Sequence, residues 1–145
     1  MTPQRLLLDT HVFLWWRADD PQLAAAAREA IAHADMVAVS AASAWEAAIK
    51  ARLGRLRLPE PFATGVTESG FSELSVRFAH AERAADLPRH HADPFDRMLV
   101  CQAVVEGLVV LTPDAEVTQV PDSGGLGVNR GGASWPRFRI VPVLL

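Results

Sequence analysis

The sequence predicts a single domain with an α/β fold built around a parallel β-sheet, and two observations support this. Short apolar runs alternate along the chain with longer stretches of helical periodicity, which is the pattern that βαβ units produce. Half of the 145 residues are hydrophobic, enough for one compact domain to bury a core without disulfide or metal staples. We therefore expect a single domain over residues 1–145.

The first strand is followed by two predicted helices. Leu6–Leu8 indicates a buried strand, and the apolar run Val12–Trp16 indicates a short helix. Asp20 followed by Pro21 is typical of a helix N-cap with proline at the first helical position. We therefore expect an alanine-rich helix that begins there and ends at about His33.

The middle of the chain predicts a second βα unit and a less regular connection. Met36–Val39 indicates a strand, and Ala42–Leu53 indicates a strong helix that Gly54 ends. Between Arg55 and Gly70 the proline and glycine content predicts an irregular connection that could contain a short helix. Glu73–Val76 is a weak strand candidate.

The next part of the chain predicts two more helices and a clear strand. Arg77–Asp86 indicates a helix, and Asp93, which precedes a proline, is typical of an N-cap. The helix that it begins continues through Glu106 and stops at Gly107. Leu108–Leu111 indicates another buried strand.

The single cysteine and the charge of the chain exclude several classes of protein. Cys101 alone cannot form an internal disulfide or the usual cysteine-based zinc sites. A net charge of −3 argues against a protein that coats nucleic acid through bulk positive charge. No run approaches the roughly twenty apolar residues of a membrane span, and the N-terminus lacks the pattern of a secretion signal. We expect a soluble cytoplasmic protein.

Acidic residues fall where a parallel sheet places its ligand site, beyond the carboxyl ends of its strands. Asp9 follows the first strand and Asp114 the fourth, while Glu46 lies early in the helix after the second. Asp93 and Asp96 share the first turn of their helix. Several like charges pack together only if a cation neutralises them, and hard oxygen ligands favour Mg²⁺ or Mn²⁺. The acids therefore predict a metal site.

Each acid also has a structural interpretation. Asp9 could form an Asx turn, and Glu46 could complete a capping box with Ser43. Asp93 could act only as an N-cap, and Asp96 could only complement the helix dipole. Taken singly these signals are weak, and the predicted topology strengthens them because it brings all the acids to one edge of the sheet.

Other polar and aromatic residues near these acids have alternative interpretations. His11 lies two residues after Asp9, a spacing that points it away from the acid on an extended chain, so we expect a local structural role. Trp15 and Trp16 belong either to the core or to an exposed apolar patch that a partner covers. A basic stretch, either a solvated face or a grip for phosphates, consists of Lys50, Arg52, Arg55 and Arg57.

Four blocks of the sequence occur in an order and with a spacing that carry a family resemblance. They are LLLDTHVFLWW, VSAASAWEAAIKARLGRLRL, LPRHHADPFDRMLVCQA and GLVVLTPD, and together they run from about Leu6 to Asp114. They resemble the motifs of PIN-domain ribonucleases, specifically VapC-type toxins of type II toxin–antitoxin systems. The resemblance implies a three-layer α/β/α PIN-like fold with a central parallel sheet of four to five strands. It also implies a Mg²⁺- or Mn²⁺-dependent endoribonuclease, neutralised by a cognate antitoxin, in a family where homodimers are common.

The resemblance assigns roles to individual residues by their positions in the blocks. The implied catalytic residues and metal ligands are Asp9, Glu46, Asp96 and Asp114. The auxiliary candidates are Asp93, the hydroxyl residues Thr10, Ser40 and Thr112, and Arg97, which would stabilise phosphate charge. The implied reaction is metal-assisted hydrolysis of RNA phosphodiester bonds.

The chain departs from the family pattern after Asp114. Family members pass quickly to a final strand, whereas this chain inserts a Gly-rich segment at about Val117–Pro136 before an apolar strand candidate at Phe138–Leu145. This difference leaves open a catalytically inactive PIN module that binds RNA or protein. A phosphohydrolase is disfavoured because it needs an acid at the position of His11. A receiver domain is disfavoured because it needs a lysine after a late strand, and the sequence has none there.

Overall fold

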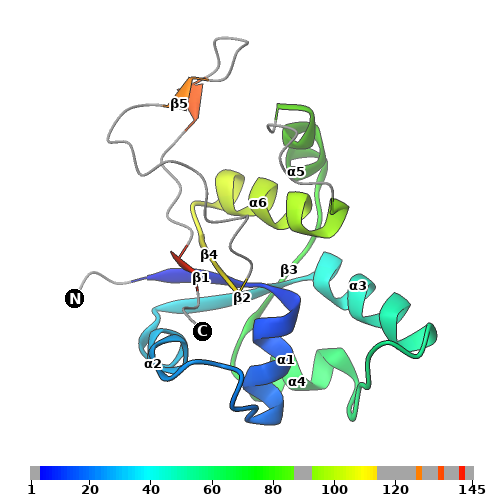
Figure 1. Cartoon of the computed structure of the whole chain (residues 1–145). Coiled ribbons are helices and arrows are strands. Elements are labelled where there is room, and N and C mark those ends of the chain that lie inside the picture. The colour runs from blue at the N-terminus through cyan, green and yellow to red at the C-terminus, as the bar shows by residue number, and fades with distance from the viewer. Residues whose placement is uncertain (1–3, 87–92, 114–126, 129–133, 136–140, 143–145) are drawn as a thin grey trace.

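The computed structural model describes residues 4–86 and 93–113, and the backbone of residues 127–128, 134–135 and 141–142. Its centre is a five-stranded sheet in the order β3-β2-β1-β4-β7, and every neighbouring pair of strands is parallel (Figure 1). The strands are β1 (Arg5–Leu8), β2 (Met36–Ser40), β3 (Ser72–Leu74), β4 (Val109–Thr112) and β7 (Val141–Pro142). The expected three-layer α/β/α fold with a parallel sheet is confirmed.

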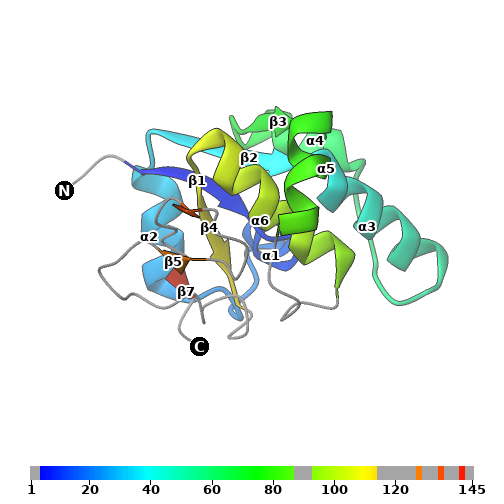
Figure 2. The same cartoon turned by 90° about the horizontal axis from the view of Figure 1, so that it is seen from above.

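The helices lie on both faces of this sheet. They are α1 (Thr10–Ala18), α2 (Ala25–His33), α3 (Ala41–Arg52), α4 (Phe62–Glu68), α5 (Phe78–Arg83) with the short 3₁₀ turn η1 (Ala84–Asp86), and α6 (Pro94–Glu106). α1, α2 and α4 lie on one side of the sheet, while α5 and α6 lie side by side on the other (Figures 1 and 2). No helix in the described ranges is long and apolar enough to cross a membrane.

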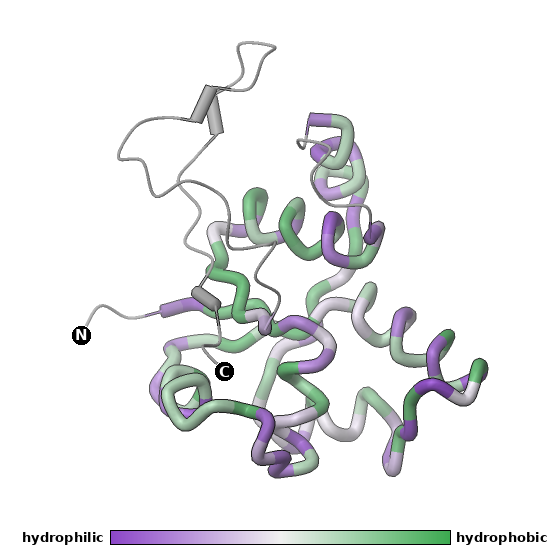
Figure 3. Tube along the Cα trace, viewed as in Figure 1, coloured by the Kyte–Doolittle hydropathy of each residue, from purple (hydrophilic) through white to green (hydrophobic). Residues whose placement is uncertain are grey.

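Alternating side chains of the strands supply two separate cores. Leu6 and Leu8 of β1 point into a core that α1, α2 and α4 cover, whereas Leu7 points into a second core beneath α6. Trp15 and Trp16 are half-buried and pack against the first core, so neither stands alone as an exposed patch. Figure 3 shows hydrophobic residues running through the central strands and along α6. A sheet that is covered on both faces explains why its strands are continuous apolar runs.

Caps determine where three of the helices begin or end. Asp9 caps α1, Ser40 caps α3, and Asp93 caps α6, and each side chain accepts a backbone N–H of the first turn. Gly107 ends α6 in the left-handed region at φ 67°, which a residue with a Cβ rarely adopts. The three N-caps lie at the end of the sheet where β1 and β2 finish, so they also position the site.

The structure corrects two predicted helix boundaries. α2 begins at Ala25 rather than at Pro21, because the Asp20 side chain accepts the Gln22 amide and closes a turn there instead of capping a helix. α1 begins at Thr10, with only Asp9 between it and the strand, and not at Val12. The connection between Arg55 and Gly70 contains the short helix α4.

The C-terminal part of the chain is described at three short places. The Gly-rich segment contains β5 (Gly127–Val128) and β6 (Ser134–Trp135), which pair antiparallel. The final strand, β7, pairs with β4 within the predicted range Phe138–Leu145. Asp114 lies outside the described residues.

Candidate active site

The carboxyl ends of three neighbouring strands meet at one edge of the sheet. Leu8 of β1 is in register with Val39 of β2 on one side and with Leu111 of β4 on the other. The next residue on each strand therefore reaches the same edge, and these residues are Asp9, Ser40 and Thr112, all buried. Because the chain leaves β1 toward β2 and later returns to its other side as β4, this edge is the position at which open α/β sheets bind ligands.

Asp9 is held in place from its backbone and from one carboxylate oxygen. Its N–H donates to the Leu111 carbonyl at 2.9 Å, and its Oδ1 accepts the His11 N–H at 2.8 Å. The residue is only 6% exposed, yet Oδ2 receives no hydrogen bond from the residues that the structure describes. A buried carboxylate with one oxygen left unbonded by the described protein is suited to a cation.

His11 lies beside Asp9, and the expectation that it points away from the acid is wrong. Its Nδ1 is 3.6 Å from Asp9 Oδ1, because the chain turns into α1 at Thr10 instead of continuing extended. The Asp9 carboxylate beside the ring is the main reason that the pKa of His11 is raised above its ordinary value, against the effect of burial. The ring remains half exposed at the rim of the site.

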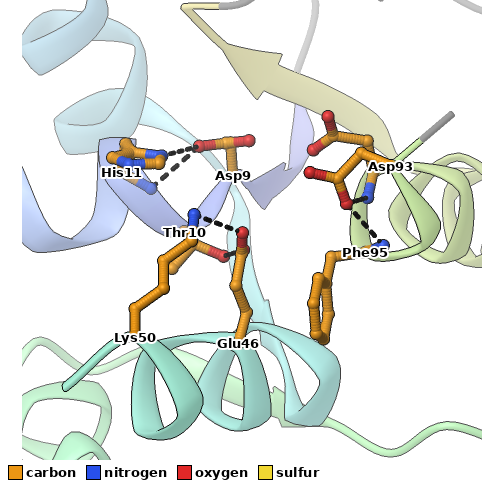
Figure 4. Close-up of polar contacts among 8 residues, drawn as sticks. Asp9, Thr10, His11, Glu46, Lys50, Asp93 and Phe95 are labelled. Atoms are coloured by element: carbon orange, nitrogen blue, oxygen red, sulfur yellow. Dashed lines mark hydrogen bonds and ion pairs between the residues drawn. The ribbon is translucent and has the colours of Figure 1, made fainter. Parts of the chain in front are cut away.

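Glu46 projects from the second turn of α3 toward the same edge, and both of its oxygens are occupied. The Thr10 hydroxyl donates to Oε1 at 2.7 Å and the Lys50 ammonium donates to Oε2 at 2.8 Å (Figure 4). Glu46 is 5% exposed. The capping-box interpretation is wrong, because α3 begins at Ala41 and Ser43 therefore lies inside the helix.

Lys50 is the basic residue that the structure adds to the site. The hydrogen bond with Glu46 is the main reason that its pKa is raised, and Asp93 and Asp9 act in the same direction. From the sequence, Lys50 is only one member of a basic stretch that is either a solvated face or a grip for phosphates. The signal that could have placed it is its spacing of four residues from Glu46, which puts both side chains on one face of α3.

Asp93 and Asp96 lie at the start of α6, which is the third element near the site. Asp93 accepts the amides of Phe95 at 2.8 Å and of Asp96 at 3.4 Å, which confirms its role as the N-cap of α6. Asp96 is half-buried in the first turn. Figure 4 shows Asp93 on the α6 side of the site, facing Asp9 and Glu46. The residue after β1, the helix α3 and the start of α6 thus all contribute carboxylates.

Arg97 makes a contact that ties two helices together. Its Nη2 donates to the Ala84 carbonyl of η1 at 2.9 Å, so the guanidinium holds α6 to the end of α5. Lys50 donates directly to Glu46, one of the candidate acids.

The side chains fit a hard divalent cation in their chemistry. Buried carboxylate and hydroxyl oxygens, without cysteine, are the ligands that Mg²⁺ and Mn²⁺ prefer. In the described parts of the chain no three acidic, histidine or cysteine side chains are close enough together to hold a metal ion. Asp114, the fourth acid that the sequence assigns to the site, lies outside those parts. The described donors are Asp9 and Glu46, with Asp93 facing them and Asp96 in the first turn of α6.

Comparison with known sequences shows related proteins of one kind. The family model described as PIN domain matches residues 6–122. Ribonuclease VapC22 of Mycobacterium tuberculosis is 34% identical over 112 residues, which cover 75% of this chain and 86% of that protein. Ribonuclease VapC16 of the same organism is 48% identical over 58 residues, or 36% of this chain and 41% of that protein.

Solved structures share the fold at low sequence identity. VapBC2 from Rickettsia felis, bound to a DNA fragment from its promoter, matches with a TM-score of 0.60 and 13% identity, over 81% of this chain and 94% of that one. DNA-bound VapBC from Salmonella typhimurium matches with a TM-score of 0.60 and 18% identity, over 97% and 99% of the two chains.

Proposed function

The chain belongs to the PIN-domain family, and from this premise we propose that it is a Mg²⁺- or Mn²⁺-dependent endoribonuclease toxin of the VapC type that acts in the cytoplasm. The observation that supports the proposal most directly is the pair of buried carboxylates, Asp9 and Glu46, which two different elements bring to one edge of the sheet. The similarity to Ribonuclease VapC22 supports RNA as the substrate.

The reaction that we propose is hydrolysis of an RNA phosphodiester bond. Mg²⁺ or Mn²⁺, when bound, supplies positive charge at the scissile phosphate and makes the attacking water more acidic. Asp9 and Glu46 would hold the cation, and Asp96 and Asp114 would complete the donor set. Asp93, at the cap of α6, would be an auxiliary acid.

Contacts within the chain prepare the two buried carboxylates for this role. The His11 amide fixes Oδ1 of Asp9 and leaves Oδ2 for a ligand. The Thr10 hydroxyl fixes Oε1 of Glu46. Ser40 and Thr112, buried at the adjoining strand ends, would line the site. Groups that are held in position before the substrate arrives need little reorganisation during the reaction.

We expect a cognate antitoxin as the protein partner, in keeping with the VapBC complexes that share the fold. A groove of about 400 Å³ lies between α1 and the segment that leads into α4, and His11 and Trp15 line it. A segment seated in this groove would lie beside Asp9, where a basic side chain could neutralise the acids. Such a contact would explain inhibition without any change in the fold.

A homodimer is the oligomeric state that we expect. Three hydrophobic side chains on α3 and its C-cap, each four residues from the next, are exposed: Trp45 by 65%, Ile49 by 38% and Leu53 by 59%. A stripe of this kind on a soluble domain is typical of a protein interface. Sedimentation of the wild type beside a Leu53→Lys variant would test this surface, because a charge in the interface should yield a monomer.

The first prediction is that Asp9→Asn abolishes metal-dependent RNA cleavage, because it removes the charge of a cation ligand and keeps the shape of the side chain. The expected loss in rate is at least about 100-fold, since the reaction would lose its cation. The measurement is cleavage of RNA by purified protein with Mn²⁺, together with sequencing of RNA ends after controlled expression.

Asp19→Asn provides a matched control for this experiment. Asp19 carries a 92% exposed side chain at the end of α1 and adopts the left-handed conformation, which asparagine tolerates well. This variant should cut RNA at the wild-type positions and rate. Full activity of Asp9→Asn would refute the assignment, and RNA binding without cleavage by the wild type would favour an inactive, RNA-binding PIN module.

A further inference from the structure

We propose that Lys50 is the resident counter-ion of the acid site, held by Glu46 in the absence of a divalent cation and released to the RNA phosphate when the cation binds. This inference rests on the proposed function. It gives a role in the site to Lys50, which is not one of the four acids assigned from the sequence. Lys50 would act as a positioning residue toward the metal and as a binding residue toward the substrate.

Both carboxylate oxygens of Glu46 already accept a hydrogen bond. Its two oxygens accept the Thr10 hydroxyl and the Lys50 ammonium, so a cation that binds Glu46 must share an oxygen with one of these donors. Thr10 is 2% exposed and fixed at the start of α1. The Lys50 side chain is 33% exposed and ends a flexible four-carbon stem, so Lys50 is the donor that can leave.

The surrounding charges act on Lys50 as well. Asp9 and Asp93, as well as Glu46, interact favourably with the Lys50 ammonium, which therefore lies in the field of three carboxylates. A divalent cation among the same carboxylates would repel the ammonium and weaken its hold on Glu46. The anion that then enters the site is the phosphate of the RNA, and an ammonium is a compact point charge suited to bind it.

The composition of the chain sets Lys50 apart from the other basic residues. Lys50 is the single lysine of the sequence, and the other basic residues, histidines apart, are arginines. Two of these arginines make structural ion pairs on the surface, Arg17 with Glu60 and Arg28 with Asp19. Arginine forms a rigid fork that suits permanent pairing, whereas lysine exchanges partners readily. The single lysine therefore lies at the position where a basic side chain would have to exchange Glu46 for the RNA phosphate.

The test compares Mn²⁺ binding to the full chain in the wild type, Lys50→Met and Arg52→Met by titration calorimetry. Loss of a competing positive charge should make Lys50→Met bind Mn²⁺ about tenfold more tightly. Arg52→Met removes the same charge two residues away and should bind Mn²⁺ like the wild type. With Mn²⁺ at saturation, Lys50→Met should cleave RNA at least about tenfold more slowly and with a higher KM, since a phosphate contact is lost.

The outcomes separate this inference from the proposed function. A wild type that neither binds Mn²⁺ nor cleaves RNA would refute the function itself. A wild type that does both, beside a Lys50→Met variant with unchanged or weaker Mn²⁺ binding, would refute only the role of Lys50 and leave an ordinary helical ion pair.

A measurement on the wild type covers the case in which Lys50→Met fails to fold. The single lysine can be followed by its rate of acylation with an amine-reactive reagent, read by mass spectrometry. We expect Mg²⁺ to increase the acylation of Lys50 and RNA to protect it again. An acylation rate that does not respond to Mg²⁺ would overturn the inference. Lys50→Arg, which keeps the charge but pairs more permanently with Glu46, should bind Mn²⁺ no more tightly than the wild type.

Discussion

Thr10 links the first strand of the sheet to the candidate site. It is the residue after Asp9 and the first of α1, it is 2% exposed, and its hydroxyl donates to Glu46 across 2.7 Å. A buried carboxylate oxygen without a donor is costly, because desolvation is not offset. The hydroxyl therefore stabilises the fold and orients Glu46 at once.

Thr10→Val should separate the hydroxyl from the shape of the side chain. Valine fills the same volume but leaves Oε1 of Glu46 without this donor, so the free energy of unfolding should fall by about 1–3 kcal/mol. Urea unfolding measures the loss, and RNA cleavage should fall with it. Thr10→Ser keeps the hydroxyl and should stay closer to the wild type in both measurements. Equal behaviour of the two variants would contradict this role.

Individual residues of the site were predictable to different degrees. Asp9 and Glu46 could be placed at one edge from strand ends and spacing, because parallel strands finish together. His11 and Lys50 could not, because their positions depend on where a helix begins and on which acid a flexible side chain selects. Asp114 falls outside the described residues, so its assignment stays a prediction.

The pair α5 and α6 is held together by a buried histidine. His80 is fully buried, its Nδ1 accepts the Arg77 N–H at 2.9 Å, and its Nε2 contacts Glu106 Oε1 at 2.8 Å. Since Nδ1 is the acceptor, Nε2 carries the hydrogen and donates to the carboxylate. One side chain thus caps α5 and fastens it to α6, the helix that carries Asp96.

His80→Ala should loosen this pair of helices. It creates a cavity and leaves Glu106 without the imidazole, so we expect a loss of about 2–4 kcal/mol in the free energy of unfolding. Hydrogen exchange should show the greatest loss of protection in α5. Glu106→Gln is the matched control, because its amide oxygen can still accept from Nε2, and it should cost less than about 1 kcal/mol. A stable His80→Ala variant would show that apolar contacts alone hold α5.

Strands and strongly capped helices were predicted from the sequence more accurately than the segments between them. The strand cores and α6 follow from apolar runs, from Asp93 before a proline, and from Gly107, all of which are local signals. The start of α2 was placed too early, because Asp20 followed by proline forms a turn as readily as a cap. α4 has no strong local signal, and its packing against the core through Val66 stabilises it.

The two buried acids of the site destabilise a molecule that already carries a net negative charge. The chain carries a net charge of −3, and two of its acids, Asp9 and Glu46, are almost fully buried at one edge of the sheet. Buried like charges destabilise a fold unless positive charge compensates them, and within the described residues Lys50 supplies that charge to Glu46. A divalent cation would supply more, so binding and folding should be coupled.

Mn²⁺ should therefore raise the melting temperature of the wild type. A ligand that binds only the folded chain stabilises it by about 2.7 kcal/mol at a concentration of 100 times its Kd, which corresponds to several degrees for a domain of this size. Asp9→Asn should lose most of this rise, because a neutral amide replaces one of the two buried acids. KCl at matched ionic strength is the control for screening and should not reproduce the rise. An equal rise in Asp9→Asn would mean that Mn²⁺ binds elsewhere on the protein, and the acids at the sheet edge would then need another explanation for their burial.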